Sequence, residues 1–302
     1  MSTRMHCYVA CLLGVVALGA SITANAGTDA KADDVDISTY SVTPEVDLMS
    51  DVLNRGVSDS FNDPGVRLGV TVAHQSGLVA VAQINNVSKQ EFNNGDGTDI
   101  TLAGGWRFGN PDRWHFGIGL ATEIFPGAQF QAPQAINLAQ LAPADITNTN
   151  FNTAYAVLEI GYGDLQGRIL NVISKNYRGA NTGGVCGAML EFMADPTRGL
   201  ECYARGPHNS RGTSLFDLDY KYALRGDTTL NLHTGYQNVV NFPEADTFDY
   251  SVGVTHTRWG VQWSLSWAGA HVRTQSLYLV QQGNQVKSID KPVLLATAVY
   301  DF

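Results

Sequence analysis

The sequence predicts an all-β fold: a transmembrane antiparallel up-and-down β-barrel of about 12 strands, with short periplasmic turns and long extracellular loops. First, apolar and polar residues alternate in segments long enough to cross a tilted bilayer. Second, short turns and long loops alternate between these segments, as in outer-membrane barrels. Third, four of the five tryptophans flank short turns, and aromatic rings favour the membrane–water boundary.

The N-terminus is expected to be removed before folding. Arg4 precedes the apolar run at 7–20, and Ala24-Asn25-Ala26 is a small-residue cleavage pattern, which together are typical of a secretory signal peptide. A membrane anchor is the alternative, but the apolar run is too short to span comfortably. The predicted divisions are a signal peptide at 1–26, an acidic disordered linker at 27–44 and the barrel at 45–302.

Alternation places the strands. The twelve predicted strands are 45–56, 65–75, 78–88, 98–108, 113–124, 153–162, 165–175, 214–224, 228–238, 247–258, 261–273 and 292–302. The stretches WHFGIGLATEI at 114–124, SLFDLDYKYAL at 214–224 and VQWSLSWAGA at 261–270 alternate apolar residues with small or polar ones. In 165–175 neither face is cleanly apolar, so its register stays open.

The connections sort into two classes. The tight ones are 76–77, 109–113, 163–164, 225–227 and 259–260, and all contain Gly, Asn, Asp or Pro. The longer ones are 57–64, 89–97, 125–152, 176–213, 239–246 and 274–291. Trp106, Trp114, Trp259 and Trp263 all lie beside tight connections, which favours a periplasmic aromatic girdle over a soluble sandwich.

The final segment, LLATAVYDF at 294–302, stays apolar on one face to its last residue. This strand is expected to pair with the first one, because an open sheet edge in lipid leaves backbone groups unsatisfied. Outer-membrane lipid and the barrel-assembly machinery, through this C-terminal strand, are therefore predicted partners.

Charge and cysteine content narrow the class of protein. The chain has 19 Lys and Arg against 28 Asp and Glu, a formal net charge of −9, which argues against nucleic-acid binding. Cys186 and Cys202 are the cysteines that remain after removal of 1–26, and an exported protein can keep them as a disulfide. Zinc is the alternative, but two cysteines without a nearby CxxC or HxxxH pair make a weak site. No metal and no cofactor are predicted.

A motif at 50–70, SDVLNRGVSDSFNDPGVRLGV, resembles the opening of the TorF-type porin family of proteobacteria. The matching residues are Ser50, Asp51, Arg55, Gly56, Ser58, Asp63 and Pro64, whereas Val52 and Leu53 depart from the aromatics of that family. HTGYQNV at 233–239 and DYSVGVTH at 249–256 look like its later strands. The resemblance implies an outer-membrane pore and supplies no substrate.

Polar residues on the inward parity are the candidate pore lining. They are Asp47, Asp51, Arg55, Arg67, Arg107, Glu123, Glu159, Asp217, Asp219, Lys221 and Asp249. Arg55 and Arg67 are expected at the tops of the first two strands, bridged to Asp51 or to loop carboxylates. Because acids exceed bases in this set, the predicted function is passive passage of small polar solutes or ions with a weak preference for cations.

A second function class is an outer-membrane lipid hydrolase. His208 and Ser210 in GPHNSRGTS share the parity of Phe216 and Leu218, and an H-x-S pair on the lipid side resembles outer-membrane phospholipases and lipid A deacylases. Those families follow the Ser with Asn, whereas Arg211 stands here, so the protein is predicted not to be an enzyme. A non-conducting barrel that presents its loops is a third alternative.

Four questions stay open at the level of sequence: the solute, the register at 165–175, whether the barrel forms homo-oligomers, and what blocks the lumen. The candidates for blocking it are the N-terminal segment and the loop 125–152, where AINLAQLA at 135–142 suggests a short helix.

Overall fold

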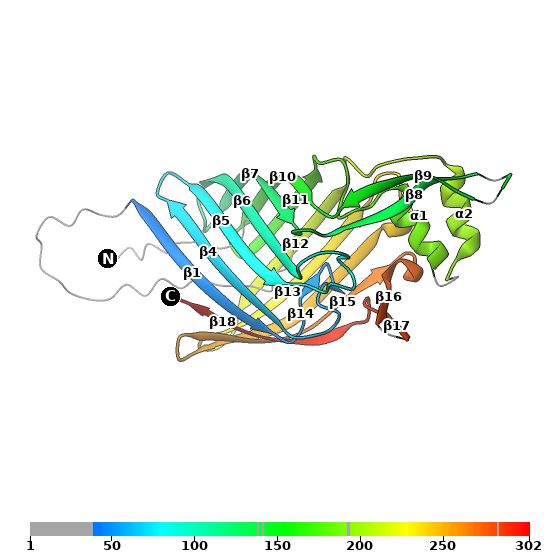
Figure 1. The fold of residues 1–302 in the computed structure, drawn as a ribbon. Coiled ribbons are helices and arrows are strands. Elements are labelled where there is room, and N and C mark those ends of the chain that lie inside the picture. The colour runs from blue at the N-terminus through cyan, green and yellow to red at the C-terminus, as the bar shows by residue number, and fades with distance from the viewer. Residues whose placement is uncertain (1–38, 138, 141, 192–193, 283) are drawn as a thin grey trace, which may run out of the picture.

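The computed structural model describes residues 39–302 except 138, 141, 192–193 and 283, and shows a closed antiparallel barrel (Figure 1). The predicted signal peptide at 1–26 and the linker residues up to 38 lie outside the described residues. Among the described residues, no helix is both long and apolar enough to cross a bilayer.

Twelve strands form the wall, and each pairs with its neighbour along the chain. They are β1 (Tyr40–Met49), β4 (Gly65–His74), β5 (Leu78–Asn86), β6 (Thr98–Gly109), β7 (Trp114–Ile124), β10 (Thr153–Tyr162), β11 (Leu165–Val172), β12 (Ser214–Ala223), β13 (Thr228–Asn238), β14 (Thr247–Arg258), β15 (Val261–Val272) and β18 (Val293–Asp301). The barrel closes where β18 pairs with β1, with Val46 opposite Tyr300. The predicted fold class is confirmed.

The first strand differs from its predicted range of 45–56. Residues 40–44, predicted as linker, pair with β4 as part of β1, and the strand ends at Met49. Pro44 cannot donate a backbone hydrogen bond, so a proline at this position argues against a strand in the sequence. Its carbonyl group nevertheless accepts a hydrogen bond from the Phe302 N–H at 3.1 Å. Residues 50–56, predicted to continue the strand, leave the wall.

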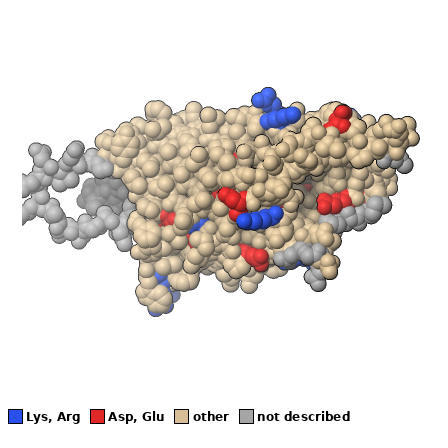
Figure 2. All heavy atoms as spheres, viewed as in Figure 1, with Lys and Arg blue, Asp and Glu red and all other residues tan. Residues whose placement is uncertain are grey.

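The outer face of the barrel is apolar, whereas the inner face carries the charged residues of the strands together with buried apolar ones such as Val157, Leu170 and Leu215. Exposed side chains on the wall include Leu68, Leu120, Leu158 and Leu265, while charged residues on the same strands are buried. Figure 2 shows a wall on which uncharged residues dominate. Such an inverted distribution is the one expected when the outside of a barrel contacts lipid.

The tight connections bring aromatic side chains together at one end of the barrel. Trp114 packs on Tyr162 with ring centroids 5.2 Å apart, and Tyr300 packs on Phe302 at 4.7 Å. Trp259, at the β14–β15 turn, is 79% exposed, as suits a ring at a membrane–water boundary.

The long connections hold secondary structure of their own at the other end (Figure 1). They contain the hairpins β2 (Leu53–Asn54) with β3 (Val57–Ser58), β8 (Gln129–Asn137) with β9 (Ala142–Asn150), and β16 (Leu279–Gln282) with β17 (Gln285–Ser288), the helices α1 (Thr182–Leu190) and α2 (Pro196–Ala204), and the 3₁₀ turns η2 (Pro243–Ala245) and η3 (Gln275–Tyr278). The helix suggested at 135–142 is wrong, because the ends of β8 and β9 occupy that range and pair with each other.

Helices α1 and α2 form a cap that a disulfide joins. The Asn181 side chain accepts a hydrogen bond from the Gly184 N–H and begins α1, and Asp195 does the same for Arg198 in α2. Cys186 and Cys202 are bonded, with Cα atoms 5.4 Å apart, which confirms the predicted disulfide. Met189 beside this bond is fully buried.

Barrel closure predicts that the last three residues are required for assembly. Deleting Tyr300, Asp301 and Phe302 removes the pairing with Glu45 and Val46 and the bond to Pro44, so backbone groups at the closure would face lipid unpaired. We expect the truncated protein to lack the heat-modifiable migration of a folded barrel on gels. Phe302→Tyr, which keeps the ring, is the control, and normal migration of the truncation would contradict the prediction.

The disulfide is expected to order the cap more than it stabilises the barrel. Closing a ring between residues 16 apart is worth about 3 kcal/mol at most for a loop on a rigid wall. In the Cys186→Ser, Cys202→Ser double variant we expect trypsin to cut faster after Arg198 and Arg205 while heat-modifiability is kept. Unchanged cleavage of the cap, or free thiols found by mass spectrometry in oxidised wild-type protein, would contradict this.

Candidate functional site

The segment between β1 and β4, residues 50–64, folds into the barrel and is called here the inner hairpin. Its strands β2 and β3 are buried, and Val52 and Leu53 pack on Met49, Ala268 and Leu295 from the wall. The turn between the two strands is Arg55-Gly56, and both residues have positive φ, 49° and 73°. This geometry is that of a tight two-residue hairpin turn, which favours glycine.

Gly56 lies against the backbone of β15. A Cβ atom at this position would collide with the carbonyl group of Gly269. The turn of the inner hairpin therefore packs directly on the backbone of the wall, an approach that a side chain at residue 56 would prevent.

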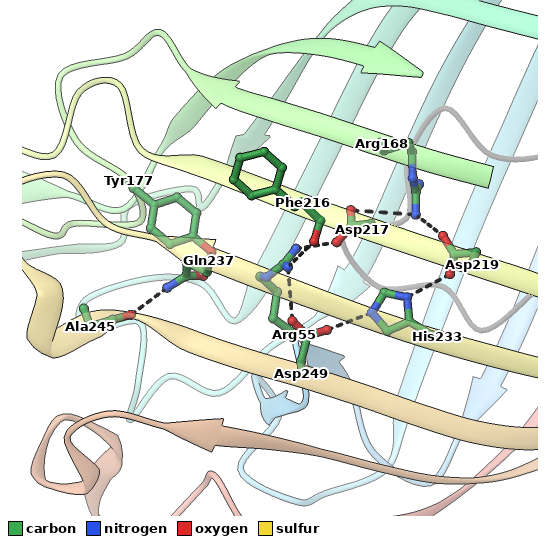
Figure 3. Close-up of polar contacts among 10 residues, drawn as sticks. All are labelled: Arg55, Arg168, Tyr177, Phe216, Asp217, Asp219, His233, Gln237, Ala245 and Asp249. Carbon is green, nitrogen blue, oxygen red and sulfur yellow. Dashed lines mark hydrogen bonds and ion pairs between the residues drawn. The ribbon is translucent and has the colours of Figure 1, made fainter. Parts of the chain in front are cut away.

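The Arg55 side chain ends between two carboxylates on the wall (Figure 3). Its Nη1 lies 2.7 Å from Asp217 Oδ1, and its Nη2 lies 3.1 Å from Asp249 Oδ2. Nη2 also donates to the Phe216 carbonyl at 3.1 Å. These side chains are almost fully buried, and buried charges are tolerated when they are paired and hydrogen-bonded.

The register of the wall creates the space for this guanidinium. Asp217 on β12 lies opposite Gly235 on β13, and Gly235 lies opposite Asp249 on β14. A Cβ at Gly235 would collide with Arg55 Nη2 and with an Asp249 oxygen. Because Gly235 has no side chain, it leaves a space between Asp217 and Asp249, and the Arg55 guanidinium occupies this space. This space is called here the socket.

A further layer of polar contacts lies next to this socket (Figure 3). The His233 ring bridges Asp219 and Asp249, with 2.8 Å to each carboxylate. Arg168 on β11 lies 3.0 Å from Asp219 and 3.9 Å from Asp217. The acids of β12 and β14 thus share three cationic or polar partners.

Arg178, in the connection between β11 and β12, contacts the inner hairpin from the side of the long loops. Its Nη2 lies 2.5 Å from Asp59 Oδ2, and its Nε lies 3.8 Å from Glu123 on β7. The guanidinium also stacks on Phe92 and Phe125, 5.2 and 5.1 Å from the ring centroids. Burial alone would lower the pKa of Arg178, but the two carboxylates raise it well above its usual range, so this base stays charged.

The predicted lining residues lie on the inner side of the structure, but their partners differ from those expected. Arg67 pairs with Asp47 at 3.2 Å, and Arg107 pairs with Glu159 at 3.1 Å. The expected bridge from Arg55 or Arg67 to Asp51 is absent from the described ion pairs. Asp51 instead accepts hydrogen bonds from Ser58 and Ser60 within the inner hairpin.

The remaining predicted acids and Lys221 are also inside. Tyr155 donates to Glu123 at 2.6 Å, and Lys221 is half-buried on β12. Sequence reasoning missed Asp59, Arg168, Arg178 and His233. The alternation of apolar and polar residues in β13 places His233 on the inward parity with Gly235, and this pattern would have predicted His233 as a lining residue. Arg168 could not be predicted in this way, because neither face of the segment 165–175 is cleanly apolar.

Two cavities lie on either side of the inner hairpin, and Arg55 lines both. The larger, on the side of the long loops, has a volume of about 920 Å³ and is called here the vestibule. The smaller, on the side of His233, Asp47 and Arg67, has a volume of about 80 Å³. The inner hairpin therefore lies between these two spaces.

The residues of the hydrolase alternative lie in the loop before β12 and not on a lipid-facing strand. The Ser210 hydroxyl is fully buried. It donates to the Ala180 carbonyl at 2.6 Å and accepts from the Tyr177 N–H at 2.8 Å. The His208 ring Nε2 lies 3.0 Å from the Arg205 carbonyl, so the described contacts of both side chains are made within the loop.

Several solved structures with a similar architecture are porins or channels. The KdgM porin in complex with disordered oligogalacturonate is 7% identical, with 86% of this chain and 98% of that chain covered and a TM-score of 0.44. The CymD monoaromatic hydrocarbon channel is 10% identical, with 87% and 88% covered and a TM-score of 0.42. An outer membrane channel from Pseudomonas putida F1 is 11% identical, with 90% and 100% covered and a TM-score of 0.40. Values this low say nothing about solute.

A comparison with curated proteins found no match. The family model that matches covers residues 33–298 and is described as "Bacterial protein of unknown function (Gcw_chp)". This match does not confirm the resemblance of the motif at 50–70 to the TorF-type porins. Since the match spans most of the chain, the protein belongs to the Gcw_chp family.

Proposed function

We propose that this protein is a porin-like channel of the outer membrane that passes small polar solutes or ions and is narrowed by the inner hairpin. The observation that supports it most is the inverted barrel, with apolar side chains outside and charged side chains inside. A soluble barrel would gain by burying those apolar side chains. An Arg or Lys on a lipid-facing wall would cost about 2–4 kcal/mol at the midplane, and an Asp or Glu would cost less. This cost accounts for the inward placement of the charged side chains.

The inward charges support a weak preference for cations. The acids on the inner side of the strands are Glu45, Asp47, Asp99, Glu123, Glu159, Asp217, Asp219, Asp249 and Asp301, against Arg67, Arg107, Arg168 and Lys221. Arg55 and Arg178 from the loops reduce this excess and do not remove it. Because low-dielectric walls strengthen the field of such charges, small cations would enter more readily than anions.

The inner hairpin would set the rate of passage. It lies between the vestibule and the smaller cavity, and its tip is held by the two ion pairs of Arg55. Membrane insertion through the barrel-assembly machinery is part of this proposal, since β18 is the strand that closes the barrel.

Releasing the tip of the inner hairpin is expected to widen the channel. Arg55→Ala breaks both buried ion pairs and leaves Asp217 with Arg168 at 3.9 Å and Asp249 with His233, at a cost of about 3–5 kcal/mol, and Gly235→Ala displaces the guanidinium without a change of charge. In planar bilayers both variants should show a larger single-channel conductance than the wild type.

Matched controls separate this effect from a general disturbance of the barrel. Arg225→Ala removes the same charge from an exposed turn, and Gly104→Ala adds a Cβ whose nearest neighbour, the Val79 carbonyl oxygen, is 3.8 Å away. Both controls should conduct as the wild type does. Folded Arg55→Ala and Gly235→Ala variants with unchanged conductance would overturn the role of the inner hairpin.

Ion selectivity tests the charge argument. The wild-type reversal potential in a salt gradient should indicate a modest cation preference, larger at low salt because screening is weaker there. Asp219→Asn combined with Glu159→Gln should shift it toward anions, since Arg168 and Arg107 then lose an acidic partner. Asp164→Asn with Asp227→Asn, at exposed turns, is the control. Anion selectivity in the wild type would refute the assignment.

A further inference from the structure

The vestibule has the size of a binding site for a small molecule. Its volume of about 920 Å³ falls in the range of about 300–1,000 Å³ typical of ligand pockets. The inner hairpin forms one side, and the connections β5–β6, β7–β10, β11–β12, β13–β14 and β15–β18 contribute the rest. A solute entering from the side of the long loops would meet this space before the narrow level at Arg55.

One part of the vestibule wall is aromatic and apolar. Half-buried Phe130 and Phe151 line it, with ring centroids 5.3 Å apart, and Phe92 lies 5.2 Å from Phe151. Tyr177 and Tyr278 line it as well. Such rings offer faces to apolar groups and to cations.

Helix α1 presents small residues to the same space. Gly183, Gly184, Gly187 and Ala188 all line the vestibule. At Gly184 the helix packs closely on Phe130, since a Cβ there would lie 3.0 Å from the ring. The helix and the phenylalanine rings therefore form one apolar surface, on which the apolar body of a solute would lie.

The charged residues that line the vestibule are Arg55, Lys89 and Arg178 together with Asp59, Glu91 and Glu191. Arg178 is paired with Asp59 and Glu123, and Arg55 is paired with Asp217 and Asp249. Glu91 lines the vestibule, yet its Oε2 is buried and has no hydrogen-bond partner among the described residues. An unpaired buried acceptor is costly, and a ligand with a positively charged donor would satisfy it.

We propose that the vestibule binds a small organic cation, an ammonium group on an aromatic or other apolar body, with Glu91 as its ionic partner. The proposal builds on the proposed channel by naming the solute class that would wait above the inner hairpin. An anionic solute would be repelled by ionised Glu91, while Asp59 is already paired with Arg178. A neutral solute would lack the charge to pair with ionised Glu91.

The electrostatics around Glu91 give this binding a pH dependence. Burial raises the pKa of Glu91 well above its usual range, Asp59 and Asp51 raise it further, and Arg178 acts in the opposite direction. Tyr278 also lies near enough to interact with Glu91. Binding of an ammonium group requires ionised Glu91, so the affinity should rise with pH until Glu91 is fully ionised.

Three ligands that share one ring test the proposal: 2-phenylethylamine, 2-phenylethanol and phenylacetate. In isothermal titration calorimetry of the detergent-solubilised protein, the amine should bind roughly tenfold or more tightly than the other two, the size expected for a charge-assisted hydrogen bond. Amine affinity should rise from mildly acidic to neutral pH. Equal affinities for the three ligands would overturn the proposal.

Variants locate the site. Glu91→Gln should abolish the preference for the amine and its pH dependence, whereas Glu201→Gln, which removes an exposed acid of α2, should leave both unchanged. Ala188→Trp, which fills the vestibule and leaves Glu91 in place, should weaken all binding of the amine. An unchanged preference in folded Glu91→Gln, or an equal loss in Glu201→Gln, would overturn the role of Glu91.

The calorimetry does not depend on conductance. Amine binding in a protein that conducts no current would refute the proposed channel and keep the binding site. A protein that conducts but shows no preference for the amine would refute the binding site and keep the proposed channel.

Discussion

Closure of the sheet is the constraint on which the rest of this structure depends. Every backbone N–H and C=O of the wall needs a partner, and pairing of β1 with β18 removes the last open edge. A closed sheet divides its side chains into an inside and an outside, because successive residues of a strand point to opposite faces. The apolar exterior and the charged interior of this barrel follow from that division.

Closure also buries carboxylates inside the barrel, and the inner hairpin supplies a base that pairs with them. Asp217 and Asp249 point inward from β12 and β14, on either side of a glycine on β13. Two buried carboxylates at this separation are costly without a base. Arg55 supplies it from a chain segment that is not part of the wall, while Arg178 fixes the other side of the same hairpin through Asp59. The segment that pairs these charges is therefore also the segment that lies between the two cavities.

The proposed channel and the proposed binding site occupy successive levels of the interior. The vestibule lies above the inner hairpin and is shaped by loops, by the small residues of α1 and by phenylalanine rings. The level of Arg55 below it is shaped by the strands and their register. Solute class would depend on the first level and rate of passage on the second, so loop residues and wall residues have separable roles.

The sequence by itself determined the barrel, its strand number and the inward parity of residues such as Asp47, Glu123 and Asp217, because alternation and turn chemistry are local properties of the chain. Only the tertiary structure decided that residues 50–64 leave the wall, since Asp51 and Arg55 keep the inward parity of Asp47. It also decided the partners: Arg55 and Asp217 are 162 residues apart, and Arg178 and Asp59 are 119 apart. Such pairs meet only when the sheet has closed and the loops have packed over it, and no local pattern in the chain encodes that meeting.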